Sequence, residues 1–345
     1  MDEKTTKPKH SVCFLYTVLT KIIISFLCDW VWTCVHKHDI VLLEKGENTM
    51  KAKTEQMKQQ RFGIEIEMTG ITRRRAAEII AEHFGTTAYG EAARDQQGRN
   101  WKLEYDGSIS RSGSQETSCE LVSPICTYED IKDIQEIVRK LHKAGARTND
   151  SCGIHIHIDG APHNAGTLRN ICNIMVSKED LITKSLQIGA HRQNNYCKKA
   201  DGSFIERINR RHTRTKENFM HQWYQGSNDN RHARYHQSRY RMLNLHSMTD
   251  KGTVEFRMFN GTMHAGKIRA YIMLCLAISH QALNQRYATP KKTETTNEKY
   301  TFRTWLLRLG MIGKEFANVR DHLLENLDGD IAFKNGRPAA APVTA

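Results

Sequence analysis

The stretch RFGIEIEM, residues Arg61–Met68, alternates apolar and polar side chains. This period of two is typical of a β-strand that buries one of its faces. Side chains i and i+2 of a strand share a face, about 7 Å apart, so Glu65 and Glu67 point to the same side of the sheet. Two neighbouring carboxylates repel each other unless a cation lies between them or one is protonated. The strand therefore predicts either a solvated polar face or part of a cation site.

Three further segments carry a similar pattern. SCGIHIHID places His155 and His157 on one strand face, and GTVEFRMFNGT does the same for Glu255 and Arg257. CELVSP adds Glu120 at the start of a strand. Hydrogen-bonded histidines or an exposed Glu–Arg pair would also produce such patterns. Imidazole and carboxylate groups together suit divalent ions, which makes metal binding the sharper interpretation.

These four polar strand faces are more informative together than singly. If they share one face of a sheet, that face holds at least four carboxylates, one or two imidazoles and an arginine. Such a cluster is tolerable only when cations accompany it. Oxygen-rich ligands with few histidines favour Mg²⁺ or Mn²⁺ over zinc. Because Mg²⁺ held by carboxylates commonly coordinates substrate phosphates, the expected chemistry is phosphoryl transfer.

Helices are expected between and after these strands. Apolar periodicity and end signals predict helices at Arg73–Phe84, from a Thr127/Asp130 capping box to Lys143, and at Thr167–Met175, Lys178–Leu186, Lys267–Leu283, Thr304–Leu309 and Glu315–Leu327. The other predicted strands are Trp101–Tyr105, Cys119–Val122, Met242–His246 and Thr253–Phe259, and Glu91–Asn100 is a predicted loop. Several strands follow one another through turns rather than through helical crossovers. This order favours an α+β fold with a mainly antiparallel sheet over a doubly wound parallel one.

Basic residues are in excess, with 51 Lys and Arg against 38 Asp and Glu, which gives a formal charge of +13 and favours a polyanionic partner. Much of the surplus lies in Ile205–Arg241, where nine basic residues accompany three acidic ones and aromatic residues are interleaved. Arginines of this segment could clamp phosphate or carboxylate groups in a bidentate fork. A nucleic-acid strip or a merely solvated basic loop would have the same composition.

The N-terminal region differs from the rest of the chain. Residues 11–35 are strongly apolar, but Lys21 and Asp29 interrupt them, and a charge costs about 2.5–3.5 kcal/mol at a bilayer centre. Three interpretations stay open for this region. It is a translated upstream region before a start at Met50 or Met57, a single membrane anchor, or a buried helix.

The predicted organisation has three parts: an N-terminal extension at 1–60, a main domain at 61–330 and a disordered Ala/Pro-rich tail at 331–345. The nine cysteines show no paired metal-ligand spacing. They favour reduced thiols in a cytoplasmic protein over a disulfide framework.

Six motifs in order resemble those of the amidoligase family, which belongs to the glutamine synthetase and glutamate–cysteine ligase-like carboxylate–amine ligases. They are FGIEIE, YDGSI, CELVSP, SCGIHIHI, SRYRMLNLHS and GTVEFRMFNGT, and the resemblance covers about Arg61 to Ala282. It implies a curved antiparallel sheet of the glutamine synthetase catalytic-domain type, with helices on its outer face. The concave face would bind ATP and two or three Mg²⁺ ions, with Mn²⁺ as an alternative.

The resemblance also implies roles for single residues. The metal ligands would be Glu65, Glu67, Glu120, His155 and Glu255. His157 would lie nearer the nucleotide, Arg257 would face the transferring phosphoryl group, and Arg239 loosely matches a substrate or phosphate arginine. Asp106 and Ser108 match a DxS turn whose role does not follow from the sequence. Thr253 stands where glutamine synthetases carry an arginine, so ammonia is no better supported as acceptor than another amine.

The implied activity is an ATP- and Mg²⁺-dependent ligase that joins a small-molecule or peptide carboxylate to an amine through an acyl phosphate. A metal-dependent hydrolase or nuclease could use the same acids and histidines, but it would turn over without ATP. A nucleic-acid-binding module using residues 205–241 would show a steep salt dependence. For the ligase, nucleic acid is not an expected partner, and a membrane is one only if residues 11–35 are an anchor.

Overall fold

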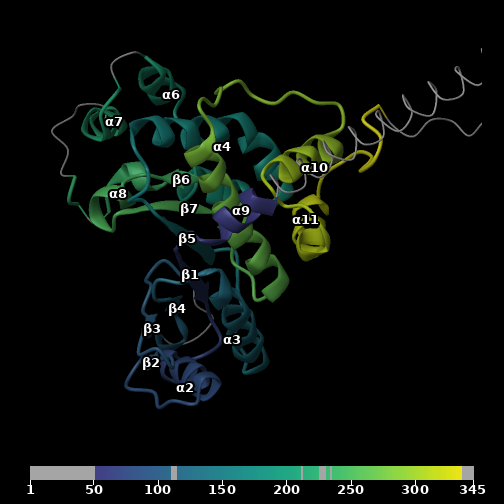
Figure 1. Ribbon diagram of the computed structural model, residues 1–345. Coiled ribbons are helices and arrows are strands. Elements are labelled where there is room, and N and C mark those ends of the chain that lie inside the picture. Colours follow the sequence, from purple (N-terminus) through teal and green to yellow (C-terminus); the bar gives the residue numbers. More distant parts are fainter. Residues whose placement is uncertain (1–50, 110–114, 211–212, 225–230, 234, 336–345) are drawn as a thin grey trace, which may run out of the picture. The chain divides into compact units, whose positions relative to one another are not determined.

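The computed structural model describes residues 51–109, 115–210, 213–224, 231–233 and 235–335 (Figure 1). The chain divides into two compact units, 1–53 and 54–345, and the first lies almost wholly outside the described residues. The apolar stretch 11–35 and most of the predicted tail lie outside them as well. Residues 54–60, which we predicted as part of the extension, belong to the second unit, where Met57 is fully buried. In the described part of the chain, no helix is both long and apolar enough to cross a bilayer.

Among the described residues, seven strands form one sheet in the order β2-β3-β4-β1-β5-β7-β6. They are β1 (Phe62–Met68), β2 (Ala92–Arg94), β3 (Asn100–Glu104), β4 (Cys119–Val122), β5 (Gly153–Asp159), β6 (Leu243–Asn244) and β7 (Thr253–Asn260). Every neighbouring pair is antiparallel, which confirms the prediction of a mixed fold with an antiparallel sheet. β1 lies at the centre between β4 and β5, so the strands with the acidic and histidine patterns are direct neighbours (Figure 1).

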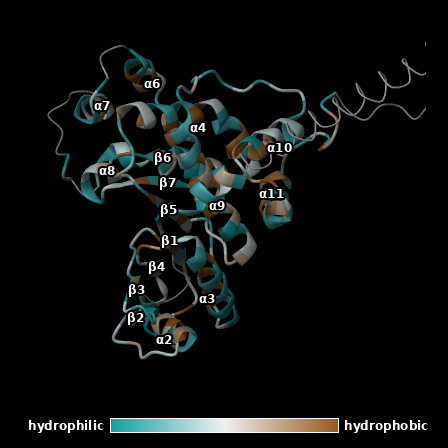
Figure 2. Cartoon of the chain, in the orientation of Figure 1, coloured by the Kyte–Doolittle hydropathy of each residue, from teal (hydrophilic) through white to brown (hydrophobic). Residues whose placement is uncertain are grey.

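One face of the sheet is apolar and covered by helices. Ile64 and Ile156 lie opposite each other on β1 and β5, and neither is more than 1% exposed. Helix α9 (Ala265–Asn284) packs against β5, and α3 (Ile131–Lys143) and α4 (Ala165–Ser185) pack against α9. Most residues of α9 are buried, which explains why its sequence is apolar nearly all round. Figure 2 shows apolar, brown stretches on α4 and on α11 as well.

The other helices are α2 (Arg73–Phe84), α5 (Ala190–Asn195), α6 (Gly202–Asn209), α7 (Lys216–Trp223), α8 (Ser247–Asp250), α10 (Glu298–Arg308) and α11 (Ala317–Leu324), with short 3-10 turns at Gln115–Thr117, Tyr128–Asp130, Gln237–Arg239 and Lys314–Phe316. α2 has the predicted bounds, because Thr72 caps its first turn and Gly85 ends it with a φ of 67°. The prediction of two helices within 167–186 is wrong. α4 runs through unbroken, since Val176 and Ser177 between the predicted parts do not end a helix.

Two segments are more ordered than a loop: Glu91–Asn100, which we predicted as one, and the basic segment, for which a solvated loop was one of three interpretations. The predicted loop Glu91–Asn100 contains β2, because the turn after β2 is held by Asp95, whose carboxylate accepts the N–H groups of Gln97 and Arg99. The basic segment contains α7 and most of α6. Trp223 packs edge-on against Phe204 at 5.1 Å between ring centres, and both are buried. This part of the segment is therefore not a merely solvated loop.

A β-bulge shapes the polar end of β7. Ile156 pairs with Phe256, but Ile154 pairs with Phe259, so one residue of β5 faces two residues of β7. The extra residue keeps both phenylalanines buried on the apolar face. It also places Arg257 within the bulge, opposite His155 on β5.

Candidate metal-binding site

Cross-strand register brings the predicted acids and histidines onto one face of the sheet. The paired residues are Glu65 with His155, Glu67 with Glu120, and His157 with Glu255. They come from four neighbouring strands, and their facing positions follow from the period of two along each strand. Below, this polar surface is called the acidic face. Metal binding by its residues stays a prediction. Three groups of neighbouring donor atoms from the described residues lie on this face.

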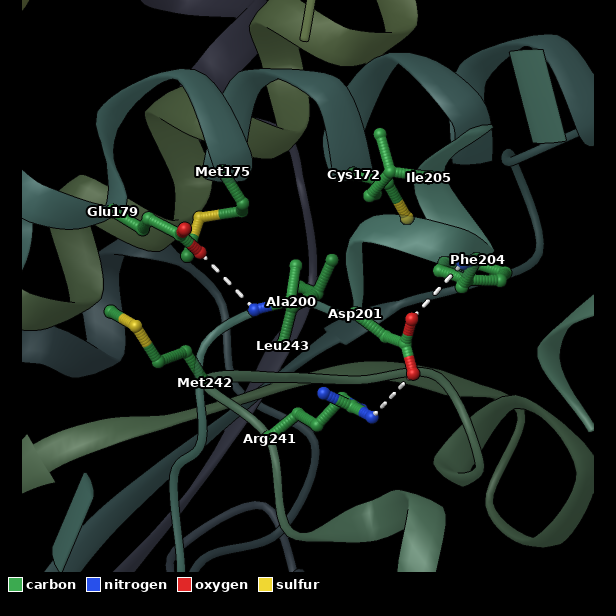
Figure 3. Close-up of a pocket in the computed structure, with 10 residues that line it drawn as sticks. All are labelled: Cys172, Met175, Glu179, Ala200, Asp201, Phe204, Ile205, Arg241, Met242 and Leu243. Atoms are coloured by element: carbon green, nitrogen blue, oxygen red, sulfur yellow. Dashed lines mark hydrogen bonds and ion pairs between the residues drawn. The ribbon is translucent and has the colours of Figure 1, made fainter. Parts of the chain in front are cut away.

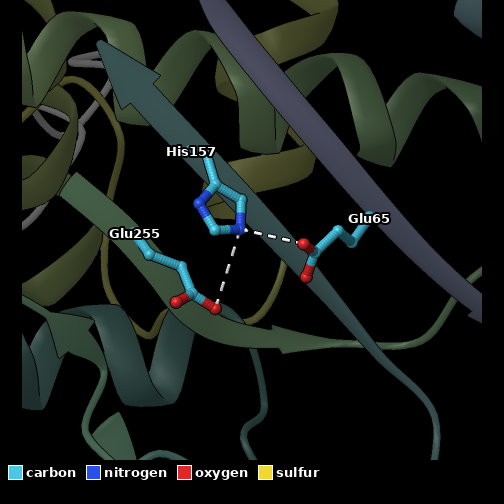
Figure 4. Close-up of side chains that lie close together, drawn as sticks. All are labelled: Glu65, His157 and Glu255. Atoms are coloured by element: carbon cyan, nitrogen blue, oxygen red, sulfur yellow. Dashed lines mark ion pairs between the residues drawn. The ribbon is translucent and has the colours of Figure 1, made fainter. Parts of the chain in front are cut away.

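One group, the histidine end, consists of Glu65, His157 and Glu255 (Figure 4). His157 Nε2 lies 3.2 Å from Glu65 Oε1 and 3.9 Å from Glu255 Oε1. One donor atom from each residue lies within 4.8 Å of the others, close enough to share a cation. All three side chains point toward the same space between the strands (Figure 4).

The protein itself supplies cations to the histidine end. Arg257 Nη1 lies 2.5 Å from Glu255 Oε1, and Lys251 Nζ lies 2.7 Å from Glu65 Oε1. Burial raises the pKa of the Glu65 carboxyl. The neighbouring histidines, His157 foremost, lower it by more than burial raises it, so the pKa lies well below its usual range. Burial likewise raises the pKa of Glu255, but the charges of Arg257, His157 and His155 together outweigh burial and hold this pKa low. Both carboxylates are therefore ionised at neutral pH.

A second group, the acidic end, consists of Glu67, Asp106 and Glu120. The N–H of Gly153 donates to Glu67 Oε2 at 2.6 Å. Burial raises the pKa of Glu67, and burial together with the charges of Glu65 and Glu67 raises the pKa of Glu120 well above its usual range. Like charges thus crowd this end without a compensating ion pair to Lys or Arg among the described residues.

A third group joins the two ends. Glu65, Glu120 and His155 offer donor atoms within 4.8 Å of one another. His155 Nδ1 lies 3.1 Å from Glu65 Oε2, and its Nε2 lies 3.7 Å from Glu67 Oε1. Since Glu65 and Glu120 each belong to two groups, the acidic face is one continuous set of donors rather than three separate sites.

Asp106 is the member of the acidic end whose role the sequence did not disclose. Its Oδ1 accepts the N–H of Ser108 at 2.7 Å, and its backbone oxygen accepts the hydroxyl of Ser118 at 2.5 Å. These bonds fix the Asp-Gly turn after β3 so that the carboxylate reaches Glu67 and Glu120. Its position just after a strand of the sheet was the feature of the sequence that could have indicated a place in the site.

The donor chemistry fits a divalent cation. His157 Nε2 is buried and, although it is near two carboxylates, has no hydrogen-bond partner with suitable geometry in the described part of the chain. On the other side of the ring, Nδ1 lies 2.9 Å from Thr253 Oγ1, which in turn lies 2.7 Å from Ser247 Oγ. When a cation is bound, Nδ1–H would donate to Thr253 and the Nε2 lone pair would face the cation between Glu65 and Glu255, as in histidines that ligate metals. Thr253, which stands where glutamine synthetases carry an arginine, thus orients His157.

Arg192 is a buried arginine that sequence reasoning missed. It comes from the short helix α5, is 5% exposed, and lies over Gly153 at the start of β5. Its Nη1 donates to the oxygen of Cys152 at 3.1 Å and its Nη2 to that of Arg257 at 3.4 Å. Arg192 therefore ties the β7 bulge to β5. A six-residue helix without apolar periodicity offers no sequence signal for this role.

Arg239, the predicted substrate arginine, lies in the turn Gln237–Arg239 and not in one of the three donor groups. Its guanidinium carbon lies 5.6 Å and 5.7 Å from the ring centres of Tyr235 and Tyr240. A contact with a substrate stays a prediction for this residue.

A pocket of about 320 Å³ opens beside the histidine end. Gly63 lies opposite His157 on the acidic face and has no side chain to fill this space. Ile125, which is 65% exposed, contributes to an apolar wall, and Lys251 adds a cation. The pocket therefore joins an apolar surface to a charged one next to the candidate metal donors.

A second cavity, between α4 and α6, has a different character (Figure 3). Its volume is about 20 Å³, which is enough for about one water molecule. The polar groups on its wall are satisfied, since Glu179 accepts the N–H of Ala200 and Asp201 lies 3.3 Å from Arg241. It is a packing gap rather than a ligand site.

The six cysteines within the described residues are all buried free thiols, in line with the expected reduced state. Burial raises the pKa of the thiol of Cys152, which directly precedes β5. A nucleophilic thiolate is therefore not expected there.

A family model matches the part of the chain that carries this site. The model of the family described as putative amidoligase enzyme matches residues 58–279, which is more than half of the chain and includes every donor of the three groups. A comparison with curated proteins gave no match. The chain belongs to the putative amidoligase enzyme family, and this membership implies ligase activity.

Proposed function

We propose that the chain is an ATP- and Mg²⁺-dependent carboxylate–amine ligase that forms an amide or peptide bond through an acyl phosphate. The observation that carries the proposal is the continuous set of three donor groups on one sheet face, in a chain of the amidoligase family. The substrates are a small-molecule or peptide carboxylate and an amine. Mn²⁺ suits the same donors as Mg²⁺.

The acidic face would hold two or three metal ions. The histidine end would take one ion, the acidic end another, and Glu65, Glu120 and His155 a third. When bound, Mg²⁺ would neutralise and orient the phosphate oxygens of ATP. The raised pKa of Glu120 supports this assignment, because an acid kept from ionising by burial and by like charges is stabilised by a nearby cation.

Other residues of the chain would position the nucleotide. The pocket at Gly63 offers an apolar wall for the base and leads toward the histidine end, where phosphates would lie. Lys251, at the edge of the pocket, would attract them. Arg257 is held by Glu255 and buried on the acidic face, so it would stabilise the charge that develops on the transferring phosphoryl group.

The reaction would proceed in two transfers. A carboxylate oxygen of the first substrate forms a bond to the γ-phosphorus, the bond from this phosphorus to the bridging oxygen breaks, and ADP leaves. The nitrogen of a neutral amine then bonds to the acyl carbon while the bond to phosphate breaks. The departing phosphate takes the proton that the amine loses. Once cations neutralise the carboxylates of the acidic face, this face would repel neither ATP nor the carboxylate substrate.

The test is an ADP-release assay of the full chain with Mg²⁺ and ATP against paired carboxylates and amines. A pair that the enzyme joins should give ADP and phosphate in equal amounts with the amide, and EDTA should abolish the reaction. ATP-independent cleavage of the amide or of a nucleic acid would instead identify a hydrolase or nuclease.

Site variants make the assay specific. Glu67→Gln and Glu255→Gln should each lower ADP release by at least 100-fold, because each removes a charged donor from a different end. Glu104→Gln is the matched control, since Glu104 lies opposite Glu120 on β3 but belongs to none of the donor groups. Normal turnover in Glu67→Gln would refute the metal assignment.

A further inference from the structure

A groove of about 720 Å³ lies among helices α3, α9 and α11 and shares no residue with the candidate metal site. All its charged or titratable lining residues are basic: Arg139, His142, Arg147, His264, Arg269 and His322. No acidic residue among the described ones lines it. Arg139 lies on α3, Arg147 in the segment between α3 and β5, and Arg269 in the first turns of α9, so three separate segments contribute cations.

The arginines of this groove have no carboxylate partners. In the described ranges, none of the three forms an ion pair within 4.0 Å. Arg147 Nη1 donates to the backbone oxygen of His142 at 2.9 Å, and Arg269 Nη2 donates to that of Glu315 at 3.2 Å. The carboxylate of Glu315 is paired with Lys58 instead, at 3.0 Å. The guanidinium charges are therefore available to a ligand.

Two histidines also line the groove, His264 at the N-cap of α9 and His322 on α11, whose Nδ1 lies 3.8 Å from Glu325 Oε2. The N–H of Lys267 donates to His264 Nδ1 at 3.2 Å, so the proton of the neutral His264 ring is on Nε2. Gly266 lets His322 come close, because a Cβ at this position would lie 2.6 Å from His322 Nε2. The two ring centres are 4.9 Å apart. Both rings thus lie at the groove with a nitrogen free of backbone bonds.

We propose that this groove binds a small anion with two or more phosphate groups. Arginine forks match phosphate oxygens in geometry and charge, and several cations from different helices suit an anion with more than one charge. The volume lies in the range of small-molecule sites, about 300–1,000 Å³. Strands of nucleic acid bind along strips with aromatic stacking, whereas no Phe, Tyr or Trp of the described ranges lines this groove.

Calorimetric titration of the full chain with inorganic tripolyphosphate, in EDTA, tests the proposal. Without divalent cations the acidic face repels phosphates, so binding there does not contribute. The wild type should bind one tripolyphosphate, and Arg139→Gln/Arg269→Gln should bind it at least tenfold more weakly. Arg139 is exposed and Arg269 partly exposed, and thermal unfolding of the variant should match that of the wild type.

The matched control is Arg74→Gln/Arg308→Gln, which removes the same charge outside the groove. It should bind tripolyphosphate like the wild type. Absent binding, equal loss in both variants, or no loss in the groove variant would overturn the proposal. Tighter binding of a single-stranded oligonucleotide than of tripolyphosphate, weakened by the groove variant, would also overturn it, in favour of a nucleic-acid surface.

Discussion

The histidine end and the acidic end of the acidic face carry similar donors, but their surroundings differ. At the histidine end, Arg257 and Lys251 pair with the two carboxylates, and the pKa values of Glu65 and Glu255 lie below their usual range. At the acidic end, burial and the charge of Asp106 raise the pKa of Glu67, and burial and the neighbouring carboxylates raise that of Glu120. The fold thus neutralises one end with its own side chains, while the other end depends on protons or on a cation from solution.

This difference has a functional consequence under the proposed ligase mechanism. An end that the chain already neutralises can keep its geometry between turnovers, because its carboxylates stay paired when the ion leaves. At an end without such pairs, a bound cation should stabilise the folded protein more, because it relieves the repulsion between carboxylates in addition to forming bonds with them. Variants at the two ends should therefore behave differently.

The largest effect is expected from Arg257→Met. The change leaves Glu255 buried without its ion pair, which should lower the free energy of unfolding by about 3–5 kcal/mol in urea denaturation. Arg61→Met is the matched control: its pair with Asp159, at 2.5 Å, is exposed on the arginine side, so its loss should cost less than about 1 kcal/mol. Equal losses in the two variants would mean that the histidine end is not neutralised by Arg257.

Mg²⁺ should stabilise the protein through the acidic end. At Mg²⁺ about a hundredfold above its Kd, the free energy of unfolding should rise by about 2.7 kcal/mol for each ion bound to the folded chain alone. Glu120→Gln should lose most of this gain, because Glu120 belongs to two of the three donor groups. Glu104→Gln on the neighbouring strand should keep it. The same Mg²⁺ response in Glu120→Gln and the wild type would remove the acidic end from the metal site.

A smaller effect is expected from Thr253→Val, which removes the hydroxyl that orients His157 at the histidine end. Such partners of metal-ligating histidines typically contribute about 10–100-fold to metal affinity. Thr253→Ser keeps the hydroxyl and should restore most of the affinity. The measurement is the Mg²⁺ or Mn²⁺ dissociation constant by calorimetry. Weaker binding in both variants alike would show that Thr253 acts through packing of its methyl group instead.

The two ends also show which features of the site could be predicted from the sequence. The alternation in RFGIEIEM and SCGIHIHID correctly indicated which side chains share a face, because a strand has a fixed period of two. The helix end at Gly85 followed from glycine's access to positive φ. The two ends of the acidic face could not be told apart, because the pairing of Lys251 with Glu65 and the crowding of Glu67 against Glu120 depend on which strands are neighbours.

Asp106 and Arg192 show the same limit. Asp106 reaches Glu67 through a turn whose direction depends on the bond from Ser118, twelve positions later. Arg192 contacts the backbone of two strands from a short helix without periodicity. The unbroken α4 has another cause, since neither Val176 nor Ser177, where we predicted a break, is a residue that ends a helix. Local patterns thus predicted elements and faces, whereas long-range contacts decide the surroundings of each donor.

The two ends should finally give opposite pH dependence in EDTA. For Glu120, the folded pKa lies above the ordinary value of 4.5, so above pH 4.5 the folded protein holds a proton that the unfolded chain has released. The free energy of unfolding should therefore fall as pH rises from 4.5 toward the folded pKa. Glu65 and Glu255 have lowered pKa values, so their contribution is present above pH 4.5 and is lost below it. The free energy of unfolding of the wild type and of Glu120→Gln, measured in urea from pH 3 to 8, should differ increasingly above pH 4.5. Both proteins should lose stability alike at low pH. Parallel curves over the whole pH range would contradict the contrast between the two ends.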